Sequence, residues 1–93
     1  MTQAYTVILR REPEGCYTAI VPALPGCLTE GDDIPDALAA AKEAIECYLE
    51  SLIADGEIIP AEPQTLSFDR DNLTEGFLFR VTVAVPEGVV ANA

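Results

Sequence analysis

The segment Leu24–Asp33, Leu-Pro-Gly-Cys-Leu-Thr-Glu-Gly-Asp-Asp, decides the fold because it contains a strand-breaking turn, a short strand and the start of a helix. Its proline cannot donate to a β-ladder and its first glycine tolerates a positive φ, so the preceding strand is expected to stop here. Cys27–Thr29 is expected to resume the sheet, and residues 30–32 to turn again. Asp33 is placed to cap a helix, since its carboxylate can accept from the amide of Asp36 or Ala37.

An amphipathic helix is predicted to follow, because apolar residues recur at steps of three and four from Ile34 onward. Pro35 fits the first turn, where a missing N–H costs nothing, and Gly56 fits the left-handed residue that ends a helix. The helix is therefore expected to be about 22 residues long. One stripe of its surface is predicted to form the core: Leu38, Ala41, Ile45, Tyr48, Leu49 and Leu52.

A β-hairpin is predicted before the Leu24–Asp33 segment. Tyr5–Arg11 and Cys16–Val21 are rich in β-branched and aromatic residues, and Pro13 and Gly15 suit the turn between them. Both faces of these strands carry apolar side chains, whereas a single long helix is available to cover one face. Either loops and the last strand cover the second face, or that face meets another protein.

The remaining chain is predicted to supply a loop and one long strand. Residues 57–64 contain two prolines and favour a loop, Thr65–Phe68 is a candidate extended piece, and Phe77–Val85 has the longest strand pattern. The order β-β-β-α-β predicts a two-layer α+β sandwich in one domain, residues 1–88, with a tail at residues 89–93. A right-handed crossover is expected to place the last strand beside the first and parallel to it, as in a truncated RNase H sheet.

The chain is strongly acidic, with sixteen Asp and Glu against five Lys and Arg and a net charge of −11. Binding of nucleic acid or of an anionic membrane by this chain alone is not expected, because affinity for phosphate comes from Lys and Arg. The charge either keeps the surface solvated or meets a basic partner. No secretory leader and no run of roughly 18 apolar residues is visible, so a cytoplasmic location is expected.

Neither catalysis nor a cofactor is expected. The chain contains no histidine and no CxxC pair, which argues against a structural zinc site and an imidazole general base. The thiols have no histidine partner and are expected to stay reduced: Cys16, Cys27 and Cys47. A turn and a helix cap account for the one local acidic cluster without a metal ion: Glu30, Asp32, Asp33 and Asp36. The sequence therefore predicts a protein that is not an enzyme.

Two motifs occur in one continuous stretch of the chain. They are Val-Pro-x-Leu-Pro-Gly-Cys-x-Thr-x-Gly-Asp at residues 21–32 and Ala-Lys-Glu-Ala-Ile at residues 41–45. Within residues 5–63 they resemble the HicB family of antitoxins and antitoxin-like proteins. The resemblance implies a partial RNase H-like fold, self-association as a homodimer or homotetramer, and binding of a HicA toxin, a small basic mRNA ribonuclease. Many members also carry a C-terminal DNA-binding module. Eight residues follow Val85 here, so operator binding is not expected of this chain.

Two functions are compatible with these features. In the first, the chain is an antitoxin of a type II toxin–antitoxin system that neutralises a HicA-type ribonuclease by covering its active surface. In the second, it is an orphan self-associating domain that serves as a regulatory adaptor or a small-ligand-binding module. For the first function, carboxylates near the central turn and on the helix would meet the toxin's basic side chains: Glu30, Asp32, Asp33, Glu43, Glu46 and Glu50. Each of these residues also fits a solvated surface.

Overall fold

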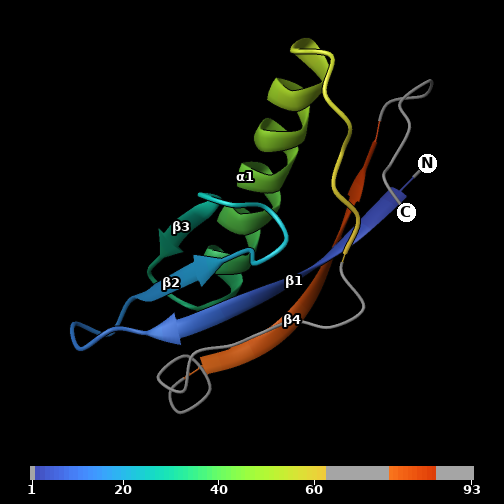
Figure 1. The fold of residues 1–93 in the computed structure, drawn as a ribbon. Helices are drawn as coiled ribbons and strands as arrows, with labels where there is room; N and C mark the ends of the chain where they lie inside the picture. Colours follow the sequence, from blue (N-terminus) through green and yellow to red (C-terminus); the bar gives the residue numbers. More distant parts are fainter. Residues whose placement is uncertain (1, 63–75, 86–93) are drawn as a thin grey trace.

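The computed structural model describes residues 2–62 and 76–85 and has a two-layer α+β architecture (Figure 1). An antiparallel sheet in the order β3-β2-β1-β4 forms one layer, and α1 packs on one face of it. The described elements are β1 Thr2–Arg11, β2 Tyr17–Ile20, β3 Leu28–Gly31, α1 Ile34–Ala54 and β4 Gly76–Ala84. The predicted β-β-β-α-β sandwich is therefore confirmed. The expected extended piece at 65–68 and the tail at 89–93 lie outside the described residues.

β1 and β2 form the predicted hairpin. The Glu12 N–H donates to the Cys16 carbonyl at 2.8 Å, and Gly15 adopts a φ of +98° in the turn. This left-handed conformation favours glycine, because a side chain there would clash with the backbone. The resulting register pairs Leu9 with Ala19, and both side chains are fully buried under α1.

α1 begins and ends where the sequence predicts. The Asp33 carboxylate accepts the Asp36 N–H at 2.8 Å, which satisfies one of the free amides at the helix start. Gly56 follows the last turn with a φ of +74°. The fully buried stripe has a spacing of four: Ala37, Ala41, Ile45 and Leu49. No helix in the described part of the chain is long and apolar enough to cross a membrane.

The direction of β4 differs from the prediction. β4 lies beside β1 at the sheet edge as expected, but Thr2 pairs with Ala84, so the two strands are antiparallel. The reason lies in the segment after α1. The Tyr5 hydroxyl donates to the Pro60 carbonyl, and two residues later a carboxylate oxygen of Glu62 accepts the Thr6 N–H at 2.5 Å. The chain thus travels along β1 before the last strand starts, and that strand has to run back.

The hydrophobic core lies between α1 and the sheet. Tyr5, Val7 and Leu9 alternate onto this side of β1 as predicted, and all three are fully buried. Val83 of β4 and Ile59 of the segment after α1 join the same cluster. Burial of side chains of this size is worth about 1.5–3 kcal/mol each, so this cluster is the main source of stability.

Apolar side chains also form a row on the opposite face of the sheet. Ile8 pairs with Ile20 on one side and Leu78 on the other, and Ile20 pairs with Leu28, so the row crosses all four strands. Leu28 and Leu78 are 64% and 54% exposed. Among the described elements, the helix lies on the other face (Figure 1). The prediction that both sheet faces carry apolar residues is confirmed.

Candidate partner-binding surface

Hydrogen bonds hold the turn between β2 and β3 against the helix. The Leu24 N–H donates to the Val21 carbonyl at 3.1 Å, and the Cys27 N–H donates to the Leu24 carbonyl at 2.9 Å. The Tyr48 hydroxyl of α1 then donates to the Pro25 carbonyl at 2.9 Å. The turn at residues 21–27 therefore sets where β3 begins relative to α1, and its hydrogen bonds have structural roles.

Gly31 brings the other end of β3 into direct contact with the helix. A Cβ atom at this position would lie 2.4 Å from the backbone nitrogen of Ala37 and 2.6 Å from its Cα. Real Cβ contacts are not this short, so only glycine fits without moving the strand or the helix. β3 is therefore tied to α1 at both ends, by Gly31 and by the turn that Tyr48 holds.

Between these two ties a shallow groove opens along the outer side of β3. Thr29 forms one wall, and the other wall consists of α1 side chains: Ala40, Glu43, Ala44 and Cys47. Its volume is about 310 Å³. The α1 wall is low because Ala40 and Ala44, which lie one helical turn apart on this flank, have short side chains. The β3–α1 groove, as we call it, is lined mainly by small side chains with one carboxylate at its rim.

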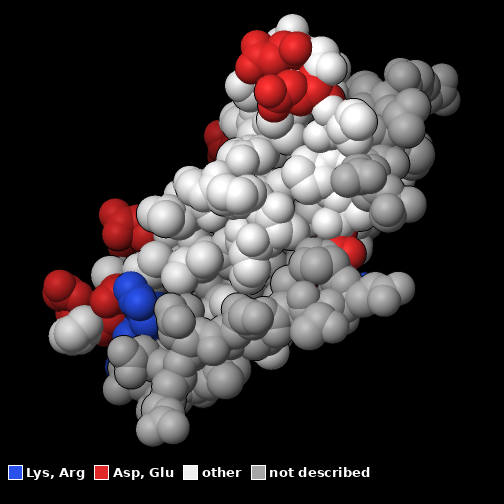
Figure 2. Space-filling view, in the orientation of Figure 1, with Lys and Arg blue, Asp and Glu red and all other residues white. Residues whose placement is uncertain are grey.

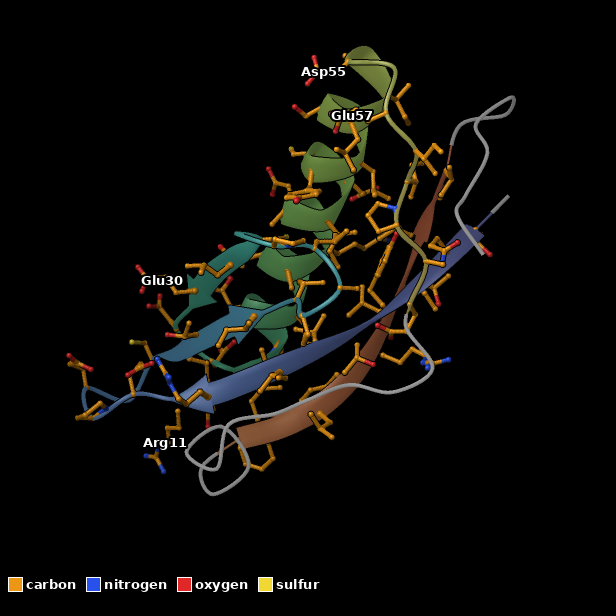
Figure 3. All side chains as sticks on the ribbon, viewed as in Figure 1. Arg11, Glu30, Asp55 and Glu57 are labelled. Carbon is orange, nitrogen blue, oxygen red and sulfur yellow. The ribbon has the colours of Figure 1, made fainter. Side chains whose placement is uncertain are left out.

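The structure divides the six predicted partner-binding carboxylates into separate groups. Glu30 projects from the outer strand β3 (Figure 3), and Glu43 borders the β3–α1 groove. Glu46 and Glu50 border a second hollow of about 320 Å³ between α1 and the end of β4. The remaining two lie at the helix start: Asp32 and Asp33. Whether these residues bind a partner remains a prediction.

The carboxylates at the helix start have local structural roles. Asp33 caps α1 through the Asp36 amide, and a carboxylate oxygen of Asp36 accepts the Asp32 N–H at 3.1 Å. Negative charge here is also favoured by the positive end of the helix dipole. The helix cap and the turn therefore account for the carboxylates of Asp33 and Asp36.

The acidic residues at the other end of α1 are different, and sequence reasoning did not single them out. Asp55 and Glu57 are exposed at the helix C-terminus (Figure 3), and the last turn of α1 contains no basic residue. Carboxylates at the negative end of a helix dipole are unfavourable. In Figure 2 acidic atoms form a cluster at this end of the molecule and separate clusters along the side that bears β3, whereas basic atoms lie mainly near the end of β1.

The thiols of Cys16 and Cys27 and the phenol of Tyr5 are not activated for reaction. Burial raises the pKa of the Cys27 thiol. Desolvation, with nearby carboxylates, raises the pKa of the Cys16 thiol, so both favour the protonated form. Burial, and to a lesser extent Glu62, raises the pKa of Tyr5 to about 12. Within residues 2–62 and 76–85, no three carboxylate, cysteine or histidine side chains are grouped so that they could hold a metal ion.

Comparison with known proteins gives one consistent result. Residues 5–90 match the family described as "HicB_like antitoxin of bacterial toxin-antitoxin system". A UPF0150 protein of Thermoplasma acidophilum is 48% identical over 58 residues, which are 62% of this chain and 84% of that protein. Antitoxin HicB of Escherichia coli is 34% identical over 65 residues, 70% of this chain and 47% of that protein.

A solved structure shares the fold. The structure described as a toxin-antitoxin complex from Streptococcus pneumoniae contains a chain that superposes with a TM-score of 0.77. The match covers 100% of this chain and 80% of that chain, at 17% sequence identity. At this identity the likeness supports the architecture, including the sheet and the helix that packs on it, and the sequence matches identify the family.

Proposed function

This chain belongs to the HicB-like antitoxin family of bacterial toxin–antitoxin systems, and on that basis we propose that it binds and neutralises a small basic HicA-type mRNA ribonuclease. The family is one of antitoxins, which confirms the expectation that the chain is not an enzyme. Under this proposal the protein works in the cytoplasm, where the mRNA substrate of such a toxin is found. It acts by occupying the toxin's surface and not by chemistry of its own.

The distribution of acidic charge is the observation that carries the proposal. The net charge is −11, and carboxylates are exposed at the C-terminal end of α1, where they oppose the helix dipole. A purely structural role does not account for Asp55 and Glu57, because their position is unfavourable for the isolated helix. A basic partner would reverse the sign of this effect, and opposite charges would also steer the two proteins together.

The gene beside this chain is expected to encode a small basic protein, and co-expression of the two proteins tests the proposal. Expression of that neighbour alone is expected to arrest growth, and expression of this chain is expected to restore it through a complex that survives purification. A matched variant with Asp55→Lys and Glu57→Lys should fold as before and restore growth less well. A neighbour that is not toxic, or one that forms no complex with the unchanged chain, would contradict the proposal.

Self-association is a second proposal, supported by the apolar row on the face of the sheet opposite α1. Leu28 and Leu78 stand more than half exposed at its two ends, and the row crosses every strand of the described sheet. An exposed apolar surface of this kind is typical of a protein–protein interface. We propose a homodimer or homotetramer, with or without a toxin.

Analytical ultracentrifugation tests self-association, and together with the toxicity of the neighbour it distinguishes the two candidate functions. The unchanged chain is expected to sediment as a dimer or tetramer in the low micromolar range, and Leu78→Glu to shift it towards the monomer. A concentration-independent monomer would overturn self-association. A stable oligomer together with a non-toxic neighbour would favour the orphan regulatory domain over the antitoxin.

A further inference from the structure

We propose that β3 and the β3–α1 groove receive an extended segment of the basic partner, which adds to the sheet as a fifth strand. The inference rests on the proposed function and specifies where the partner docks. β3 is the outermost strand on its side of the sheet in the described part of the chain. It also forms one wall of the groove, so backbone pairing and side-chain binding can occur at the same place.

The backbone of β3 offers hydrogen bonds on its outer side. Paired residues in an antiparallel ladder alternate between hydrogen-bonded and non-hydrogen-bonded pairs. The Val21 N–H donates to the Cys27 carbonyl at 3.1 Å, which fixes this alternation next to β3. Leu28 and Glu30 therefore point their N–H and C=O groups away from β2. No other described strand pairs with this edge, and exposed edge groups of this kind readily accept an added strand.

The two sides of β3 predict which side chains the docked strand carries. Thr29 faces α1, so the partner residue beside it would enter the β3–α1 groove against Ala40, Ala44 and Cys47. The groove is shallow and lined by small groups, which suits a compact apolar side chain. Because side chains alternate along a strand, the partner's next residue would lie on the opposite face beside Glu30.

Charge indicates that this strand is basic. Glu30 and Glu43 are exposed on either side of the outer edge of β3, and Asp32 continues the acidic run beyond it. Lys42 does not neutralise these carboxylates. An α-helix turns by about 100° per residue, so Lys42 lies on the opposite flank of α1 from Ala40 and Cys47. A basic residue opposite Glu30 would be attracted, in line with cross-strand pairing of opposite charges.

The same charges argue against a second copy of this chain at the β3 edge. An antiparallel pair of β3 strands would bring two copies of Glu30 onto one small, two-stranded junction. Like charges at such close range are destabilising. The edge of β3 therefore suits a basic protein, whereas the exposed ends of the apolar row, Leu28 and Leu78, suit an apolar surface.

A bulky residue in the groove tests the inference. Cys47 is exposed on the groove wall, so Cys47→Trp should fill the groove without disturbing the core. Ala39→Trp is the matched control, because Ala39 is also exposed on α1 but does not line the groove. Binding is measured by isothermal titration calorimetry with the neighbouring basic protein, purified from the complex. Cys47→Trp is expected to weaken binding at least about 100-fold, and Ala39→Trp to stay within about threefold.

A proline in β3 tests the backbone pairing separately. Glu30→Pro removes one outward-facing N–H, a change that edge strands tolerate, and Glu30→Thr is the control that keeps this donor. Circular dichroism confirms that both variants fold. Weaker binding by Glu30→Pro than by Glu30→Thr supports the added strand, and equal binding by all four variants overturns the inference while leaving the proposed function intact. Failure of the unchanged chain to bind the neighbour overturns both.

Discussion

Replacing Gly31 by alanine is expected to destabilise the protein strongly, although the change adds a single methyl group. The new Cβ would lie 2.4 Å from the Ala37 nitrogen, 2.6 Å from its Cα and 2.8 Å from the Asp36 carbonyl carbon. All three atoms belong to the backbone of α1, so no side chain can rotate away. The strand and the helix have to separate, and the buried Ala37 loses packing with them.

The magnitude follows from two opposing terms. Overpacking a tight site costs typically about 1–3 kcal/mol, and this contact belongs at the upper end because the opposing atoms are backbone. Restricting the unfolded chain with an alanine returns about 0.4–1 kcal/mol. The expected net loss is about 2–3 kcal/mol. For a domain of this size that corresponds to a fall in Tm of about 10–20 °C.

Urea unfolding followed by circular dichroism measures this loss, with Gly26→Ala as the control. Gly26 has a φ of +80°, and no atom lies within 4 Å of the place that its Cβ would take, so its substitution strains the backbone without a clash. A left-handed alanine costs about 1–2 kcal/mol. The reasoning about close packing is refuted if Gly31→Ala is as stable as the unchanged protein, or no less stable than Gly26→Ala.

Three further predictions concern caps and titrating groups. Asp33→Ala should lower the free energy of unfolding by about 1 kcal/mol, whereas Asp33→Asn should lower it little, since the asparagine side chain can still accept a hydrogen bond from the Asp36 N–H. Equal losses in the two variants would contradict a capping role. Because burial raises the pKa of Tyr5 to about 12, one phenol of the folded protein should resist ionisation at about pH 11. The stability that this shift contributes is present below the ordinary tyrosine pKa of about 10, and it should be lost as the pH rises through the folded pKa of about 12. A Tyr5→Phe variant should lack this phenol in a spectrophotometric titration. Hydrogen bonds from the Thr18 hydroxyl, and secondly from Arg10, lower the pKa of Glu12, so ionised Glu12 stabilises the fold above its unfolded pKa and this stabilisation is lost as the pH falls through the folded pKa. Thr18→Val should therefore lower the free energy of unfolding in urea more at about pH 7 than at about pH 3. An equal loss at both pH values would refute the link.

The hairpin and the helix could be predicted because their signals are local. The turn before Cys16 and the cap at Asp33 involve residues within a few positions of one another, and the helical stripe repeats every three or four residues. Such patterns specify an element without knowledge of the rest of the chain. The rule for right-handed crossovers correctly placed the last strand at the edge beside β1, although not its direction.

The direction of β4 could not be predicted because it depends on distant contacts. Tyr5 bonds to Pro60, and Thr6 bonds to Glu62 through both its N–H and its hydroxyl, the latter at 2.7 Å. Fifty-five or more positions separate these partners, and no pattern near Pro60 indicates that it follows β1. The rule for right-handed crossovers assumes a direct return from the helix, and this chain does not return directly.

The candidate binding surface was predicted only in part. Helical periodicity put Glu43, Glu46 and Glu50 on one exposed side, but the structure assigns Glu43 to one hollow and the other two to another. The difference arises because α1 faces β3 on one flank and β4 on the other, which periodicity does not reveal. The groove itself depends on small side chains, and alanines in a helix carry no specific signal of a binding site.

Inhibition of RNA cleavage by purified proteins tests the central claim most directly. The neighbouring basic protein would be incubated with a labelled mRNA while this chain is added in increasing molar ratio. If the chain is an antitoxin that covers the toxin's active surface, cleavage should fall to background at stoichiometric amounts, and Cys47→Trp should shift the titration to higher ratios. Cleavage that continues unchanged in a large excess of the chain would contradict the account.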